Sequence, residues 1–132
     1  MKLLVDTHIF IWDALSIPKL SQQAKTALDA AEQQQTLWVA DMSLWEVFML
    51  AKRGRISLPV SAKQFIELAL QARGYQIQHM TLDIAQDAVS FGAEINNDPA
   101  DRLIVASARY LGATLLSADN NLQSCGLVSV LA

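Results

Sequence analysis

Short apolar runs alternate with longer segments of helical periodicity along this chain. The apolar runs predict β-strands, and the segments between them, whose apolar residues recur at helical spacing, predict helices. Gly54, Gly74 and Gly112 follow three of the helical segments, and Pro99 stands where a first helical turn tolerates proline. The predicted strands lie at 2–5, 36–40, 75–80, 113–117 and 127–131. The predicted helices lie at 9–15, 21–35, 41–53, 61–73, 81–94 and 99–111.

This alternation limits the sheet that the chain can form. Strands joined through helices need crossover connections, and crossover connections give parallel neighbours. We therefore predict an α/β fold with a mostly parallel, five-stranded sheet that has helices on both faces. The 132 residues are enough to bury a core, and no linker or repeat divides them, so residues 1–132 are predicted to form one domain.

Composition constrains the partners of the protein. Hydrophobic residues make up 52% of the chain and charged residues 17%, a balance that favours burial of some apolar surface by self-association. The net charge of -3 provides no general attraction for nucleic acid. A polyanionic partner would therefore have to be held by local basic residues or by a bound metal cation.

Cysteine usage and hydropathy bear on the location of the protein. The single cysteine, Cys125, excludes an internal disulfide and fits a reducing compartment. The apolar run at the N-terminus meets Asp6 too early to form the core of a signal peptide, and no window resembles a membrane span. We expect a cytoplasmic protein without a membrane partner.

Carboxylates follow several of the predicted strands. Asp6 ends the first strand, Glu46 lies in the helix after the second, Asp101 opens a late helix, and Asp119 follows the fourth strand. The carboxyl ends of parallel strands lie along one edge of a sheet, and open α/β folds bind ligands at that edge. The four acids are therefore predicted to converge there.

Each acid also has a purely structural interpretation. Asp6 and Asp98 can cap helices, Asp119 can shape a turn, and Ser43 with Glu46 has the spacing of a capping box. The local surroundings favour a site instead. Glu46 has no cation at its helical neighbour positions, and Asp6 follows a run of core residues, where an unpaired carboxylate costs free energy.

Several carboxylates at one place repel one another, and a hard divalent cation reverses that repulsion. Oxygen ligands suit Mg²⁺ or Mn²⁺, whereas zinc prefers cysteine and histidine clusters that this chain lacks. A Mg²⁺ held by a few carboxylates keeps several waters, so it can orient one for attack on a phosphate diester and neutralise the developing charge. The pattern predicts a metal-dependent nuclease.

Three segments of the sequence resemble one known family. "LLVDTHIFIW", "SLWEVFMLAKRGRISLP" and "DPADRLIVASARYLGATLLSAD", in this order and over nearly the whole chain, are similar to the PIN domain, particularly the VapC toxins of bacterial toxin-antitoxin pairs. The resemblance implies an α/β/α sandwich and a Mg²⁺- or Mn²⁺-dependent endoribonuclease. It also implies an RNA substrate, an antitoxin partner that blocks the site, and a homodimer.

The resemblance also assigns roles to residues of this chain. The acidic set of the family falls on Asp6, Glu46, Asp101 and Asp119, as catalytic and metal-binding residues. Asp6 and Asp101 would hold the main metal, Glu46 would hold it through water or orient the nucleophile, and Asp119 would complete the site or hold a second ion. Ser117 matches a hydroxyl position that holds the last acid or a metal-bound water.

Two departures from the family pattern concern the fit of the substrate. Ala100 stands where relatives of this type often carry a bulky aromatic residue, and Asn96 and Asn97 replace a more basic lead-in to the "DP" pair. Neither departure changes the predicted metal site.

Basic side chains offer two predictions for RNA phosphate contacts. Lys52 and Arg53, with Arg55, cluster at the end of the helix that carries Glu46, where a solvated helix end explains cations equally well. Arg102 is the other candidate, with pairing to a neighbouring carboxylate as its alternative.

The histidines and tryptophans have structural interpretations first. His8 is placed to act as a general base, but a histidine packed on the first helix is the better prediction. Trp12, Trp38 and Trp45 are predicted to lie in the core or at an interface, with base stacking as a minor alternative.

Other α/β families fit the sequence less well. A haloacid-dehalogenase-like phosphatase would need a second aspartate at position 8, where this chain has His8, and a dinucleotide-binding fold would need a glycine-rich turn. The main alternative is a non-enzymatic interaction module, a degenerate PIN fold that meets a protein partner through apolar faces. Acids at all four family positions favour the enzyme.

Overall fold

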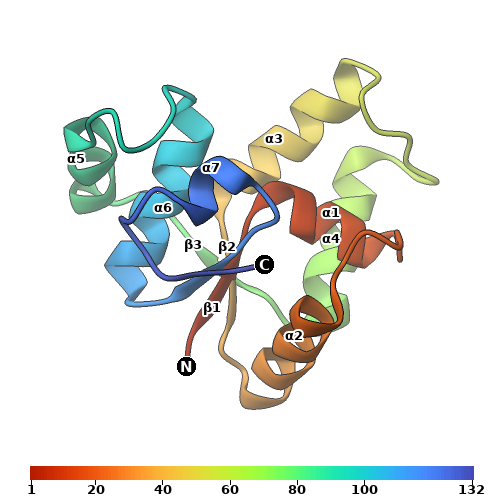
Figure 1. Ribbon diagram of the computed structural model, residues 1–132. Coiled ribbons are helices and arrows are strands. Elements are labelled where there is room, and N and C mark those ends of the chain that lie inside the picture. Colours follow the sequence, from red (N-terminus) through yellow and green to blue (C-terminus); the bar gives the residue numbers. More distant parts are fainter.

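Five short strands form one parallel sheet at the centre of the molecule (Figure 1). The computed structural model describes all 132 residues. The strand order is β3-β2-β1-β4-β5, so β1 lies in the middle of the sheet, with β2 on one side and β4 on the other. The strands are β1 (Leu3–Val5), β2 (Leu37–Ala40), β3 (Gln76–Gln78), β4 (Thr114–Leu116) and β5 (Val130–Leu131).

Helices cover both faces of this sheet (Figure 1). They are α1 (Thr7–Ala14), α2 (Gln22–Gln34), α3 (Asp41–Lys52), α4 (Ala62–Arg73), α5 (Leu82–Ser90), α6 (Pro99–Leu111) and α7 (Asn120–Gln123). Side chains alternate along β1: Leu3 and Val5 pack with residues of α1, α2 and α4, whereas Leu4 packs with residues of α5 and α6. All three are fully buried, so the sheet separates two hydrophobic cores.

Capping residues set the limits of most of the helices. The hydroxyls of Ser21, Ser61 and Thr81 accept backbone N–H groups of the first turns of α2, α4 and α5. Gly74 and Gly112 end α4 and α6 with φ of +68° and +64°, a left-handed conformation that glycine adopts without a Cβ penalty. These signals are local, so the predicted starts of α2, α4 and α5 and the predicted ends of α4 and α6 are close to the observed ones.

The predicted fold class is confirmed, and the differences are local. The helix that follows Thr81 ends at Ser90 and does not reach residue 94, because the backbone becomes extended at Phe91. Residues Asn120–Gln123, which follow the turn considered for Asp119 and for which no helix was predicted, form the short helix α7. None of the helices has the length and apolar character needed to cross a bilayer.

An ion-pair network ties α4 to α1 and α2. The guanidinium of Arg73 donates to both carboxylate oxygens of Asp13, at 2.6 and 2.9 Å, and its Nη1 donates to Asp29 at 2.9 Å and to Glu32 at 3.0 Å. The hydrogen bonds to Asp13 raise the pKa of Arg73 above its ordinary value in spite of partial burial. The network therefore helps to fix α1, the helix that follows Asp6.

Candidate active site

The carboxyl edge of the sheet opens between β1 and β4. From β1 the chain builds the sheet outward through β2 and β3, and β4 then pairs on the opposite side of β1. Loops leaving neighbouring strands diverge at such a switch in strand order and leave a crevice. Asp6 directly follows β1 and Ser117 directly follows β4, so both residues lie at this crevice.

Asp6 is held at the base of the crevice by two hydrogen bonds. One carboxylate oxygen accepts the backbone N–H of Ile9 at 2.9 Å and caps α1, and the other accepts the hydroxyl of Ser117. Burial raises the pKa of Asp6 above its ordinary value, and the bonds from Ser117 and Ile9 offset part of the rise. The same side chain thus caps a helix and faces the site.

Helix α3 brings Glu46 to the same crevice. The Thr7 hydroxyl donates to the Glu46 carboxylate and lies 3.0 Å from the Ser43 hydroxyl. Burial raises the pKa of Glu46, the bond from Thr7 lowers it, and the carboxylates at the start of α6 raise it further. The capping box considered for Ser43 and Glu46 is wrong, because α3 begins at Asp41 and both residues lie inside the helix.

The first turn of α6 supplies Asp101. Its carboxylate accepts Nδ2 of Asn96 at 2.9 Å, and the backbone N–H of Asn96 donates to the side chain of Asn121 at 3.1 Å. Burial raises the pKa of Asp101; the bond from Asn96 lowers it, and neighbouring carboxylates add to the rise. Asn96, considered in the sequence only as a departure from the family, therefore orients a site carboxylate.

Two further acids, Asp98 and Asp119, line the crevice from exposed positions. Asp98 caps α6 by accepting the N–H two positions ahead at 2.9 Å, and Asp119 caps α7 in the same way at 2.8 Å. The hydroxyl oxygen of Ser117 accepts the backbone N–H of Asp119 at 3.1 Å while it donates to Asp6. Ser117 therefore joins the backbone of one acid to the carboxylate of the other.

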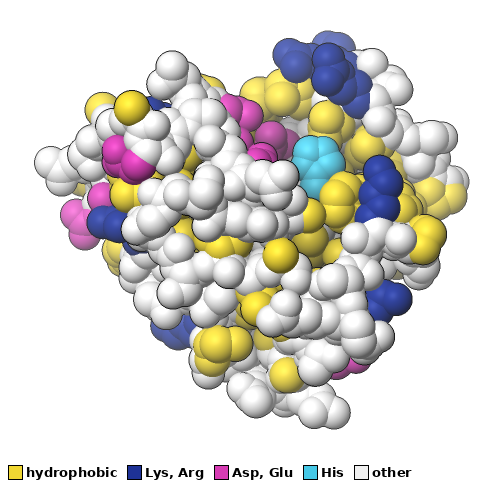
Figure 2. Space-filling view, in the orientation of Figure 1, with side chains coloured by type: hydrophobic (Ala, Val, Ile, Leu, Met, Phe, Trp, Pro, Cys, Tyr) yellow, Lys and Arg dark blue, Asp and Glu magenta, His cyan; other side chains and the backbone are white.

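The acids gather in one cleft. Figure 2 shows acidic side chains in a hollow between the lobe that contains α5 and α6 and the arm formed by α3, next to a histidine. The cleft has a volume of about 350 Å³, and all four acids predicted from the sequence, Asp6, Glu46, Asp101 and Asp119, line it. Four segments that are distant in sequence thus bring carboxylates to one place.

The donor chemistry of the cleft fits a hard divalent cation. Asp6, Glu46 and Asp101 all have raised pKa values because of burial, so in metal-free protein their charged forms are disfavoured, and a cation would favour them. No group of three His, Cys, Asp or Glu side chains forms a ready-made metal cage. A complete protein cage is not required for Mg²⁺, which commonly uses one or two carboxylates and keeps several waters.

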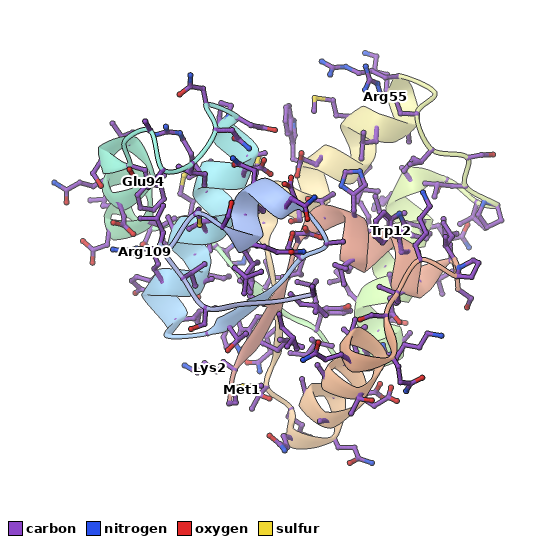
Figure 3. All side chains as sticks on the ribbon, in the orientation of Figure 1. Met1, Lys2, Trp12, Arg55, Glu94 and Arg109 are labelled. Atoms are coloured by element: carbon purple, nitrogen blue, oxygen red, sulfur yellow. The ribbon has the colours of Figure 1, made fainter.

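The two groups of basic residues predicted to contact RNA lie in different surroundings: one is free at the surface, and the other is bound to backbone oxygens. Lys52, Arg53 and Arg55 are exposed and form no ion pair, and basic side chains gather at the far end of α3 above the cleft (Figures 2 and 3). Arg102 does not line the cleft. Its guanidinium donates to the carbonyl oxygens of Asn96 at 2.8 Å and of Phe91 at 2.7 Å, with further oxygens near by.

The sequence offered two interpretations of Arg102, a contact with RNA phosphate and pairing with a neighbouring carboxylate. The structure shows neither, because the guanidinium is bound to backbone carbonyl oxygens. Its donors hold the loop between α5 and α6 instead. Because that loop contains Asn96, the arginine supports the orientation of Asp101 indirectly. We assign Arg102 no direct contact with RNA.

His8 is a site residue that sequence reasoning placed differently. The sequence predicted a histidine packed on the first helix; His8 lies on α1 with its ring near that of Trp12, at 5.8 Å between centroids, but it is exposed and lines the cleft. The spacing of His8 and Trp12, four residues apart on a helix that begins at a site acid, is the signal that could have indicated this shared face. Of the other tryptophans, Trp38 is partly buried and Trp45 is 56% exposed.

The raised pKa of Glu46 predicts a pH dependence of stability. A carboxylate whose pKa is raised on folding contributes stability below its ordinary pKa, and this contribution is lost as the pH rises through the raised value. In metal-free protein, Glu46→Gln should therefore melt close to the wild type near pH 4 and above it at pH 7. Melting curves between pH 4 and 8 measure this difference.

Addition of Mg²⁺ should narrow the difference at pH 7, because bound cation stabilises the wild-type carboxylates by mass action. Glu67→Gln, at an exposed glutamate of α4, is the matched control and should follow the wild type at every pH. A pH-independent difference for Glu46→Gln would contradict the role given to burial.

Comparison with known proteins gives the family of the chain. The PIN domain matches residues 3–126. The chain is 34% identical over 122 residues to Ribonuclease VapC22 of Mycobacterium tuberculosis, an alignment that covers 92% of this chain and 89% of that protein.

Solved structures show the same fold. A VapBC2 complex from Rickettsia felis bound to a promoter DNA fragment superimposes with a TM-score of 0.74 at 14% identity, covering 99% of this chain and 98% of that one. A toxin-antitoxin complex from Klebsiella pneumoniae gives a TM-score of 0.69 at 24% identity, covering 99% and 97%. The family match, the VapC22 likeness and the acid-lined cleft at the switch in strand order agree, and the chain belongs to the PIN-domain family.

Proposed function

We propose that this protein is the endoribonuclease toxin of a VapBC-like toxin-antitoxin pair. The observation that carries the proposal is the convergence of Asp6, Glu46, Asp101 and Asp119 on one cleft of a PIN domain. The likeness to Ribonuclease VapC22 over most of both chains supports an RNA-cleaving activity.

The proposed cofactor is Mg²⁺ or Mn²⁺. Asp6 and Asp101 would hold it, Glu46 would hold it through water or orient the attacking water, and Asp119 would complete the site or hold a second ion. When bound, such an ion supplies an acidified water and positive charge for a phosphodiester.

The residues around the acids would fix their orientation for this reaction. The hydroxyls of Ser117 and Thr7 donate to Asp6 and Glu46, and the amide of Asn96 donates to Asp101. Donors that occupy one oxygen of a carboxylate leave the remaining lone pairs for a cation, and such outer contacts commonly change metal affinity or activity by about 10- to 100-fold when removed.

RNA would approach along the α3 side of the cleft. Lys52 and Arg53 are exposed there without an acidic partner, so their charge remains available for phosphates. This local positive charge and the proposed metal offset the overall net charge of -3, which by itself repels RNA.

The proposed protein partners are a cognate antitoxin and a second copy of this chain. Toxin-antitoxin complexes among the solved structures of this fold support the antitoxin. Large apolar side chains exposed on α3 and α5 support a homodimer; they are Trp45 at 56%, Phe48 at 46%, Leu82 at 89% and Val89 at 83%. We also propose a cytoplasmic location, where an RNA substrate and a reduced Cys125 are both expected.

Cleavage of RNA by the purified protein tests the proposal. The chain, freed of any antitoxin, is incubated with a mixture of single-stranded and structured RNAs in Mg²⁺ or Mn²⁺, and in parallel with a chelator. We expect cuts within the RNA that depend on the metal and disappear with the chelator. Equal cutting in the chelator would contradict the metal site, and no cutting in any metal would favour the non-enzymatic interaction module.

A further inference from the structure

The walls of the cleft differ in chemical character. Carboxylates of α6 and the loop before α7 line one side, and the exposed face of α1 contributes His8 and Trp12. Asp6 lies at the base between them. An RNA strand whose phosphate meets the carboxylates would therefore have a neighbouring nucleotide beside the aromatic residues of α1.

His8 has no structural task that explains its position. Its side chain is exposed, forms no hydrogen bond or ion pair, and lies beside the ring of Trp12, at 5.8 Å between centroids and an interplanar angle of 56°. Its neighbours on α1, Thr7 and Ile9, are buried, so the helix is fixed while the imidazole projects into the cleft. An aromatic ring on a rigid support with an open face is suited to stacking.

Trp12 and His8 form the aromatic wall of the cleft. Trp12 is partly buried, and the ammonium of Lys19 lies over its ring. The indole packs partly against the core under α1, and Nζ of Lys19 lies 5.2 Å from the centroid of its ring. The ammonium thus lies over the indole ring and forms no ion pair with an acidic side chain. Aromatic groups followed by a cation match a nucleobase followed by a phosphate.

The cleft is acidic, so binding of RNA there needs an attraction that does not depend on charge. Five carboxylates line it, and a polyanion gains little from such a surface apart from the proposed metal. Stacking of a base on an aromatic ring does not depend on the net charge of the protein, and every base has a π-face. A base paired in a duplex is already stacked, so a wall of this kind favours unpaired nucleotides.

We propose that His8, supported by Trp12, is the stacking platform for an unpaired nucleobase next to the scissile phosphate, with Lys19 contacting the following phosphate. The proposal rests on the function proposed above and extends it by naming the part of the cleft that binds the base. His8 acts here through its ring face.

Three variants separate stacking from other roles of His8. His8→Ala removes the ring, His8→Phe keeps a flat ring but removes the nitrogen atoms, and His79→Ala removes the other histidine, which is exposed beside Asp41 and outside the cleft. Each is combined with Asp101→Asn so that binding of a short single-stranded RNA can be measured by fluorescence anisotropy without cleavage. Melting curves check that each variant folds.

We expect His8→Ala to weaken binding by about 5- to 150-fold, the range for loss of one stacked base, and His8→Phe to bind within about threefold of the parent. His79→Ala should bind like the parent. Without the Asp101 change, His8→Ala should raise KM for single-stranded RNA more than it lowers kcat. An RNA that lacks the base next to the scissile phosphate should bind the parent and His8→Ala equally, because it has no base to stack on the ring.

Equal loss of binding in His8→Phe and His8→Ala would overturn the stacking role, since only the nitrogen atoms would then matter. Unchanged binding in His8→Ala would also overturn it, even if the wild type cleaves RNA normally. Failure of the wild type to cleave any RNA is a different result, because it rejects the proposed function itself.

Discussion

Asp101→Asn is expected to reduce metal-dependent RNA cleavage by about a thousandfold or more, because it removes the charge of a proposed metal ligand and keeps its shape. The fold should survive, since an asparagine oxygen can still accept the Nδ2 donor of Asn96. Burial raises the pKa of Asp101, so loss of its charge should leave the metal-free protein at least as stable as the wild type. Initial rates and melting curves of the same preparations measure both effects.

Asp101 is a cleaner test than Asp6. The carboxylate of Asp6 accepts two donors, the N–H of Ile9 and the hydroxyl of Ser117, and an amide would have to turn a donor toward one of them. Asp83→Asn is the matched control, because Asp83 is also an acid in the first turn of a helix, but it is exposed and lies outside the cleft. Wild-type cleavage by Asp101→Asn would remove this residue from the metal site.

Arg73→Met is expected to lower the free energy of unfolding by about 2 kcal/mol and the melting temperature by about 6–12 °C. The substitution leaves Asp13, whose side chain is only 14% exposed, without its bidentate partner, and it leaves Asp29 and Glu32 close to it. The exposure of Asp29 and Glu32 weakens their own share, so most of the loss comes from Asp13. Denaturant unfolding monitored by tryptophan fluorescence measures the change.

The matched control for Arg73 is Arg55→Met at the exposed end of the arm (Figure 3), which should change stability very little because Arg55 forms no ion pair. A second change in the same network, Asp13→Asn, should recover part of the stability of Arg73→Met, because it removes the carboxylate left unpaired. Stability of Arg73→Met equal to the wild type would show that the network is only a surface arrangement.

Asp101→Asn tests the proposed chemistry of the cleft, whereas Arg73→Met tests the packing that holds the cleft in place. Asp101 lies in the cleft, whereas Arg73 holds α4 against α1 through Asp13, and neither Arg73 nor Asp13 lines the cleft. Because Asp6 caps α1 and His8 projects from it, the position of this helix affects both the proposed metal site and the aromatic wall.

Local signals in the sequence were sufficient to predict most of the helices and strands. Ser61 and Gly74 define α4, and Pro99 and Gly112 define α6, because caps depend on neighbours within one turn. The end of α5 was predicted too late, because the segment after Ser90 keeps helical composition although its backbone becomes extended at Phe91. There, Arg102 of another helix donates to the carbonyl oxygen of Phe91, a contact that the sequence alone does not reveal.

The candidate acids could also be chosen from the sequence, since Asp6, Glu46, Asp101 and Asp119 stand after strands or in the first turns of helices and match a known family. Their hydrogen-bond partners could not. Ser117 reaches Asp6 across 111 positions and Thr7 reaches Glu46 across 39, and such pairings exist only after the strands have assembled in one order.

By itself, the sequence determined the order of the strands and of the longer helices and the parallel character of the sheet, because these depend on periodicity, on caps and on the crossover that a helix between two strands imposes. It also named the candidate acids, through their places after strands or in the helices that follow them and their match to a known family. The tertiary structure alone decided that Arg102 binds loop carbonyls and that His8 faces the cleft. The physical reason is that the partner of a long polar side chain depends on which oxygens packing brings within about 3 Å of it, and residues distant in sequence supply those oxygens.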